Sequence, residues 1–322
     1  MTELTSTLHP WHKQAYADLQ QLTTRLPHAI LLHAPYAMDL DNLAISWINY
    51  LLCENKIGAC GHCHACQLLL DGSHPDFYRV RLDENDDKKT IGVDKVREVV
   101  TFLSVSTHMA KYKIVLIEDS NLLTTSSANA LLKILEEPPK YALFILLSNN
   151  IERLLPTIKS RCFKYRLQPP THADAMKHLA LNNIENGQFW LNFYANCPLF
   201  EPAITATQLA TAIHTLITPN IDNLYAFLQE FDGKAISFSF ILEFLNKWVS
   251  DLTCYKMTGK LNYFIDYADQ LSPIAAKLQL NLAFYLLDQI NILLPWAEHP
   301  LNYKLQIENL LFQYQQIFVS RK

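Results

Sequence analysis

The sequence predicts an α/β domain with a parallel sheet, followed by two all-helical domains. Through the first 168 residues, short apolar runs alternate with amphipathic stretches, which is typical of parallel strands joined by helices that cover the sheet. Beyond residue 168 the apolar residues recur at helical spacing. The chain has 322 residues, 50% of them hydrophobic, and a net charge of −4, so it is long enough for two or three domains and is not a uniformly basic nucleic-acid binder.

Five short apolar runs are the expected strands. They lie at 29–32, 77–80, 114–117, 143–147 and 163–167. Between them, Val and Leu residues recur at helical spacing from 93 to 103, which predicts a helix there. Another helix is expected to begin among the Ser and Thr residues near 125 and to end near Glu137, because Pro138 and Pro139 cannot continue it.

A proline-rich joint at 167–174 predicts a domain boundary, with Thr171 as the N-cap of the next helix. Helical patterns follow at 173–183, 188–196, 206–216, 221–231, 237–257, 274–294 and 301–318. A break near 197–205 divides this region in two. We therefore expect three domains. They span 1–168, 169–204 and 205–322, the last two being a small lid-like helical domain and a larger C-terminal helical domain.

Four cysteines have the spacing C-x6-C-x2-C-x2-C. They are Cys53, Cys60, Cys63 and Cys66. The N-terminus is no signal peptide, and the longest apolar run is too short to span a bilayer, so we expect a cytoplasmic protein with no membrane partner. Its cysteines should then be reduced, and four thiolates suit one structural Zn²⁺ with a closed tetrahedral shell.

Such a zinc ion would fasten an insertion at 53–76. Unligated thiols and a redox Cys-x-x-Cys pair are the alternatives, and His62 or His64 could replace one cysteine.

The tripeptide 74–76 is compatible with a turn before a strand or with a role at an interface. The charge run at 83–89 is expected to be a solvated loop.

Residues 29–52 have the setting of a phosphate-binding site, namely an apolar run, a short loop and an amphipathic helix. In nucleotide-binding α/β proteins this loop is rich in glycine and ends in Gly-Lys-Ser/Thr. The loop 33–39 has no glycine and no lysine, and Asp39 stands where phosphate would lie. We therefore expect a degenerate loop that binds no ATP. The adjacent acids Glu118 and Asp119, which would hold Mg²⁺ beside a nucleotide, are then expected to be structural or without function.

Arg161 lies in the tripeptide Ser160-Arg161-Cys162, between a short helix that begins near Pro156 and a strand. Several basic residues surround it in the sequence. On spacing alone, a surface arginine in a salt bridge is the favoured interpretation. Cys162 is expected to be a small buried apolar residue.

Taken together, these segments resemble the delta-prime family of bacterial DNA polymerase III clamp-loader subunits. The resemblance covers residues 9 to about 200 and rests on "HPWH", "LLCENKIGACGHCHACQLLLDGSHPDF", "IGVDKVREV", "NALLKILEEPP" and "ERLLPTIKSRC". It implies an AAA+-like fold that has lost nucleotide binding, and hence no intrinsic catalysis. It also implies a role in loading the sliding clamp onto primed DNA during replication.

The resemblance gives Arg161 a function in trans. It implies that this side chain acts as an arginine finger on ATP held by an adjacent subunit, where a guanidinium neutralises the charge that develops on the transferred phosphoryl group. It further implies that Phe200 replaces an ATP-sensing arginine and that Asn149 and Asn150 stand at a polar sensor position. Expected partners are a gamma/tau-type ATPase, the delta subunit, the sliding clamp and primed DNA. The C-terminal domain is expected to join an oligomeric collar.

Two other functions are considered. An active AAA+ ATPase is disfavoured by the missing Gly-Lys-Ser/Thr, and a nucleotide titration would decide it. A zinc-dependent nucleic-acid-binding protein that uses 53–66 as its reader is disfavoured because that stretch holds only Lys56 as a certain cation. A salt-dependent affinity for duplex DNA would revive it.

Overall fold

The computed structural model describes residues 8–35, 38–55, 60–82, 90–200, 202–220, 222–223, 227, 236–297 and 303–318. The chain divides after Asp174 into two compact units, Met1–Asp174 and Ala175–Lys322. The finer division into three domains, with boundaries at 168 and 204, stays a prediction.

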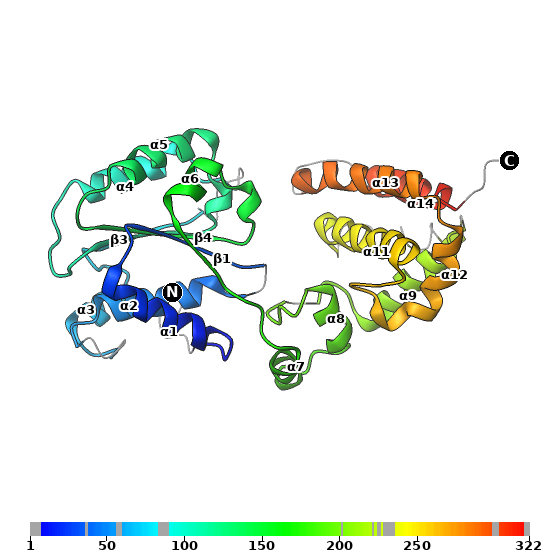
Figure 1. Cartoon of the computed structure of the whole chain (residues 1–322), viewed down its shortest axis with the longest axis horizontal. Coiled ribbons are helices and arrows are strands. Elements are labelled where there is room, and N and C mark those ends of the chain that lie inside the picture. Colours follow the sequence, from blue (N-terminus) through cyan, green and yellow to red (C-terminus); the bar gives the residue numbers. More distant parts are fainter. Residues whose placement is uncertain are drawn as a thin grey trace. The chain divides into compact units, whose positions relative to one another are not determined.

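The first unit is built on a five-stranded parallel sheet (Figure 1). Its strands are β1 (Ala29–His33), β2 (Phe77–Val80), β3 (Lys113–Ile117), β4 (Ala142–Ser148) and β5 (Phe163–Arg166), in the order β2-β3-β4-β1-β5. All five predicted strands are confirmed, with small shifts at their ends. The three central strands are buried almost throughout, which explains their continuous apolar runs.

Helices cover both faces of this sheet. On one face lie α4 (Val93–Leu103), α5 (Thr125–Glu136) and α6 (Pro156–Arg161), and on the other α1 (His12–Leu22), α2 (Leu40–Leu52) and α3 (His64–Leu70) (Figure 1). Alternate strand residues such as Leu31 and Phe144 pack under α4–α6. The helices predicted at 93–103 and from near 125 to Glu137 are confirmed, because α4 spans 93–103 and α5 ends one residue before Glu137, its C-cap.

Asp76 fastens an edge of the sheet. Its side chain is fully buried just before β2, and its carboxylate accepts hydrogen bonds from three consecutive backbone N–H groups, those of His108, Met109 and Ala110, at 2.7–2.8 Å. The backbone N–H of Asp76 in turn donates to Nδ1 of His74 at 3.1 Å. The segment 74–76 is therefore a buried turn that holds the loop before β3.

The described part of the second unit is helical. Its helices after α7 (His172–Leu181) are α8 (Gly187–Phe193), α9 (Ala206–Ile217), α11 (Phe238–Thr258), α12 (Ala268–Lys277), α13 (Leu280–Leu293) and α14 (Tyr303–Gln316). The backbone N–H of Asp174 donates to Oγ1 of Thr171 at 3.2 Å, as expected for an N-cap of α7. Within this unit α11 packs against α12 and α13, and α13 packs against α14.

The prediction of one helix over 274–294 was wrong. The backbone of Leu278 and Gln279 is extended and separates α12 from α13. Leu278 is buried, so its apolar side chain continues the periodic pattern across a break in the backbone. Also, α12 begins six residues before Ile274 and runs through Pro273. Most of the predicted helix 221–231 and the whole charge run 83–89 lie outside the described residues.

Among the described residues, none of the helices combines the length and the apolar character that crossing a bilayer requires.

Candidate metal centre and the loop before α2

The four predicted cysteine ligands come together. Their Sγ atoms all lie within 4.8 Å of one another, with 4.0 Å between Cys53 and Cys63 and 3.9 Å between Cys60 and Cys66. A tetrahedral ion with Zn–S bonds of about 2.3 Å requires sulfur atoms about 3.8 Å apart. The donor set and its spacing therefore fit one metal ion with four thiolate ligands.

Two helix ends bring these sulfur atoms together. Cys53 is the C-cap of α2, Cys63 is the N-cap of α3, and Cys66 lies in the first turn of α3. Oε1 of Glu54 accepts from the backbone N–H of Ala65 at 3.4 Å and so links the end of α2 to the start of α3. Residues 56–59, between the first and second cysteines, lie outside the described residues.

Hydrogen bonds to sulfur favour thiolates at the exposed side of the cluster. The backbone N–H of Cys63 and the amide of Asn55 each donate to Sγ of Cys60 at 3.3 Å. Backbone hydrogen bonds from His62 and Cys63 lower the pKa of Cys60 to about 6, whereas burial raises the pKa of Cys66. A divalent cation would offset the cost of a buried thiolate at Cys66. Neither His62 nor His64 belongs to the cluster of donor atoms.

The loop 33–39 leads from β1 into α2, and its own acid occupies the start of that helix. Asp39 has a left-handed backbone (φ 53°), and its Oδ1 accepts from the backbone N–H of Asn42 at 3.2 Å. In a phosphate site these first-turn N–H groups would point at the ligand. Here a carboxylate of the chain takes one of them and adds a negative charge. Tyr36 and Ala37 lie outside the described residues.

The start of α1 and the residues just before it pack against this loop. His12 is fully buried, and its Nε2 donates to the carbonyl oxygen of Met38 at 2.8 Å. Nε2 of His9 lies 3.2 Å from Oδ2 of Asp39, and the His9 ring stacks on Trp11 with 4.5 Å between centroids. Partial burial would raise the pKa of Asp39, but hydrogen bonds from His9 and Asn42 outweigh it and lower that pKa. Asp39 is therefore ionised at neutral pH.

Further carboxylates lie near the same helix end. Glu118 follows β3 and forms an ion pair with Arg79 of β2. Asp41, in the first turn of α2, is in contact with water on one side only. The partial loss of hydration, and after it the charges of Glu118 and Asp119, raise the pKa of its carboxyl to about 7. This accumulation of acids disfavours the negative charge of a triphosphate. The ion pair with Arg79 gives Glu118 a structural contact, whereas its expected lack of a role in nucleotide binding stays a prediction.

Arg161 ends α6 at the protein surface. Its Nη2 donates to Oε1 of Glu136, the last residue of α5, at 2.5 Å. Its Nη1 donates to the carbonyl oxygen of Thr157 at 3.0 Å. The side chain is 34% exposed, and the neighbouring Cys162 is buried, as expected. Lys164 and Arg166, on β5, are exposed.

The N-terminal half of the chain matches a known family. The family model described as "DNA polymerase III, delta subunit" matches residues 11–171, which is half of the chain. The chain belongs to this family. Proteins named DNA polymerase III subunit delta' from Escherichia coli strain K12 and from Pseudomonas aeruginosa are 40% identical over 177 residues and 38% identical over 175 residues. The predicted resemblance to the delta-prime family is confirmed.

These alignments cover 53% and 54% of this chain and 52% of each delta-prime relative. The chain thus spans about half the length of the curated relatives it matches. A DNA polymerase III subunit tau/gamma from Haemophilus influenzae is 31% identical over 158 residues, which cover 48% of this chain and 22% of that protein.

In this member of the delta-prime family, the two positions discussed as nucleotide sensors have different surroundings. Phe200 is 8% exposed, and its ring stacks on Tyr194 with 4.7 Å between centroids and lies near Trp190. It is an apolar packing residue of the second unit. Asn149 and Asn150 are exposed directly after β4, and the backbone N–H of Asn150 donates to Oγ of Ser148.

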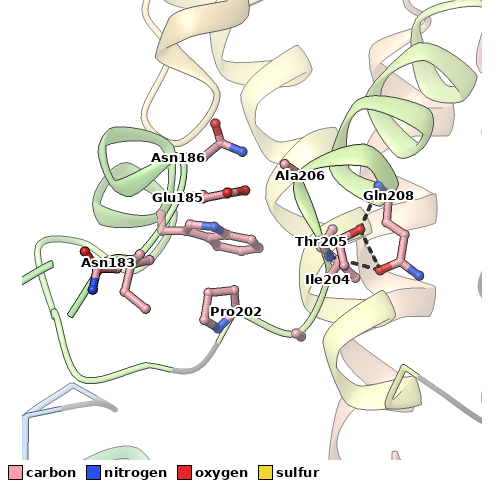
Figure 2. A pocket seen from close by; sticks show the side chains of 11 residues that line it. Asn183, Glu185, Asn186, Pro202, Ile204, Thr205, Ala206 and Gln208 are labelled. Carbon is pink, nitrogen blue, oxygen red and sulfur yellow. Dashed lines mark hydrogen bonds between the residues drawn. The ribbon is translucent and has the colours of Figure 1, made fainter. Parts of the chain in front are cut away.

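An open pocket of about 360 Å³ lies beside the segment that follows Phe200. Figure 2 shows Glu185 and Asn186 on one side of it and Thr205 and Gln208 on the other. Among the described residues that line it, Glu185 is the one that carries a charge. Thr205 and Gln208 cap the start of α9 with their own side chains, so this helix end offers few free N–H groups to an anion. The pocket therefore has no features of a phosphate site.

Sequence patterns did not point to several residues that shape these sites. His9 and His12 pack on a loop about 30 residues later in the chain, and Glu136 pairs with an arginine 25 residues away. The motifs "HPWH" and "NALLKILEEPP" contain these residues, but nothing in their spacing shows which group each side chain meets. Likewise, no sequence pattern indicated that the side chain of Asn55 donates to Sγ of Cys60.

Proposed function

We propose that this protein is a non-hydrolysing clamp-loader subunit that binds no ATP itself and serves an ATPase neighbour in trans. It would act in the DNA polymerase III complex that loads the sliding clamp onto primed DNA. Family membership supports the complex, and the tau/gamma relative supports an AAA+-like ancestry shared with an ATPase. Expected partners are the gamma/tau-type ATPase and the delta subunit, with a cytoplasmic location.

The observation that carries the proposal is the carboxylate of Asp39 at the start of α2. A phosphate group would have to displace this carboxylate from the backbone N–H of Asn42, or approach it against charge repulsion. Nε2 of His12 donates to the carbonyl oxygen of Met38, the residue before Asp39, and so helps to hold the loop in place. Since the loop also lacks the lysine and glycines that hold phosphates, ATP binding in cis is not expected.

Arg161 is proposed as the trans arginine finger. Arg161 is the last residue of α6, and its side chain is partly exposed, which is compatible with contact to a phosphate on another chain. A finger of this type lowers the barrier of phosphoryl transfer in the neighbour, where its effect is about 10³–10⁵ in rate.

The cysteine cluster is proposed to hold one structural Zn²⁺. Cys53, Cys60, Cys63 and Cys66 would fill all four positions of the ion, leaving none for a reactive water molecule. The ion would tie α3 to the end of α2 and so stabilise the segment 53–76. The C-terminal helical domain is proposed as the oligomerisation region.

Reconstitution tests the proposal. The chain is mixed with gamma/tau-type ATPase and delta subunits, and the assembly is examined by native mass spectrometry and by clamp loading on primed DNA. We expect a defined complex whose loading activity requires this chain although the chain alone hydrolyses no ATP. Loading at the full rate without this chain, or failure to assemble, would contradict the proposal.

A further inference from the structure

The guanidinium of Arg161 is held by groups of its own chain on two sides. Nη1 donates to the carbonyl oxygen of Thr157 at 3.0 Å and lies 3.5 Å from Oγ of Ser160. Nη2 donates to Oε1 of Glu136 at 2.5 Å, a charge-assisted contact. A guanidinium has five N–H donors. These three contacts leave two donors without a partner in the part of the chain that the structure describes.

Glu136 lies at a rigid point of the fold. It is the last residue of α5, and Pro138 prevents the helix from continuing. Leu131 and Leu135 of α5 and Ile158 of α6 are buried in the same apolar core, and the two helices contact each other. The carboxylate and the guanidinium are thus carried by two helices that cannot easily move apart.

This ion pair contributes more to orientation than to stability. The Arg161 side chain is 34% exposed and that of Glu136 is 50% exposed, and ion pairs with such access to water stabilise a fold weakly. An unpaired surface arginine, in contrast, samples many rotamers. Fixing its planar fork before a ligand arrives removes the entropic cost of ordering it at the moment of reaction.

We propose that Glu136 is a positioning residue for Arg161. It holds the guanidinium at the surface so that the two remaining N–H donors face the γ-phosphate of ATP bound by a neighbouring subunit. Because Glu136 contacts only the side of Nη2, Arg161 can keep this ion pair while it binds phosphate oxygens. The inference rests on the proposed role of Arg161 as a trans finger.

The test uses the whole clamp-loader complex with ATP, clamp and primed DNA. Five forms of this chain are compared with the wild type, namely Glu136→Ala, Glu136→Gln, Glu137→Ala, Arg161→Ala and the double variant Glu136→Ala/Arg161→Ala. The ATP turnover that is lost in the Arg161→Ala complex measures the part of the turnover that comes from the adjacent ATP site. We expect Glu136→Ala to slow that part about twofold to fivefold in kcat, with KM for ATP unchanged, because the neighbour binds the nucleotide.

Four comparisons separate positioning from a general loss of structure. Glu136→Gln should restore most of the rate, since its amide oxygen still accepts from Nη2. Glu137→Ala is the matched control, because this next carboxylate is exposed and the carboxylate that accepts from Nη2 of Arg161 is that of Glu136. Glu136→Ala and Glu137→Ala chains should melt at the same temperature. In the Arg161→Ala background, Glu136→Ala should have no further effect.

The possible failures differ from one another. Wild-type turnover by Arg161→Ala overturns the proposed function together with this inference. A slow Arg161→Ala complex beside a Glu136→Ala complex of wild-type rate overturns only the inference. A loss from Glu136→Ala that persists in the Arg161→Ala background also overturns it, because Glu136 would then act through another group.

Discussion

The carboxylate of Asp39 caps α2 by accepting a hydrogen bond from the backbone N–H of Asn42 at 3.2 Å. This single contact joins two properties of the chain. It stabilises the helix that follows β1, and it places a negative charge at a helix start of the kind that binds phosphate in nucleotide-binding α/β proteins. The first turn of α2 is thus capped by a side chain of the chain itself rather than left open to a ligand.

The first prediction concerns ATP. Titration of the isolated chain with Mg²⁺-ATP, followed by calorimetry, should show no saturable binding at millimolar concentration. The melting temperature should also be independent of ATP, since a ligand that binds the folded state would raise it. Asp39→Ala should destabilise the chain by about 1 kcal/mol through loss of the cap and still bind no ATP, because lysine and glycines remain missing. Tight ATP binding by the wild type would identify an active nucleotide site.

The second prediction concerns the metal. Elemental analysis of protein purified without chelators should find about one zinc per chain. The double change Cys60→Ser and Cys63→Ser should remove the metal and increase hydrogen exchange in 60–76, while exchange in α11 stays unchanged. Cys254→Ser is the control, because this cysteine is not part of the cluster. A zinc content near zero in the wild type would contradict the metal site.

The third prediction concerns Arg161. In the reconstituted complex Arg161→Ala should leave assembly intact and reduce ATP turnover and clamp loading in part, because the other ATP sites do not depend on this side chain. Arg161→Lys should rescue poorly, since an ammonium lacks the planar fork. Lys164→Ala, a change of an exposed cation nearby on β5, should have a much smaller effect. An intact Arg161→Ala complex with wild-type turnover would show that the arginine is only a surface residue.

The fourth prediction concerns Asp76 and acid. Burial would raise the pKa of this carboxyl, but the three N–H donors of residues 108–110 outweigh it and lower the pKa. A lowered pKa in the folded state means that the stabilisation is complete above the unfolded value, about 4, and is lost as pH falls through the folded value. Asp76→Asn should therefore destabilise the first unit by about 2–4 kcal/mol at pH 7, and the difference from wild type should shrink below about pH 4.

Hydrogen exchange measures this effect locally. The amides of His108, Met109 and Ala110 should lose protection in Asp76→Asn at pH 7, and the exposed Asp71→Asn should leave them unchanged. Equal protection of these amides in Asp76→Asn and wild type would show that the carboxylate contributes little.

The sequence by itself determined the elements whose cause is local. A strand such as β4 follows from an apolar run, the end of α5 follows from Pro138, and the clustering of the four cysteines follows from their spacing. In each case the deciding residues are neighbours in the chain. The absence of glycine and lysine from 33–39 likewise needs no knowledge of the fold.

Only the tertiary structure decided the contacts between distant residues. His12 contacts Met38, Asp76 contacts residues 108–110, and Glu136 contacts Arg161. The packing of helices and strands brings these residues together. The pattern of neighbouring residues in the sequence does not indicate which distant residues will be in contact. The split of 274–294 into two helices has the same origin. Burial keeps Leu278 apolar whether the backbone there is helical or extended, so hydrophobic periodicity cannot distinguish the two.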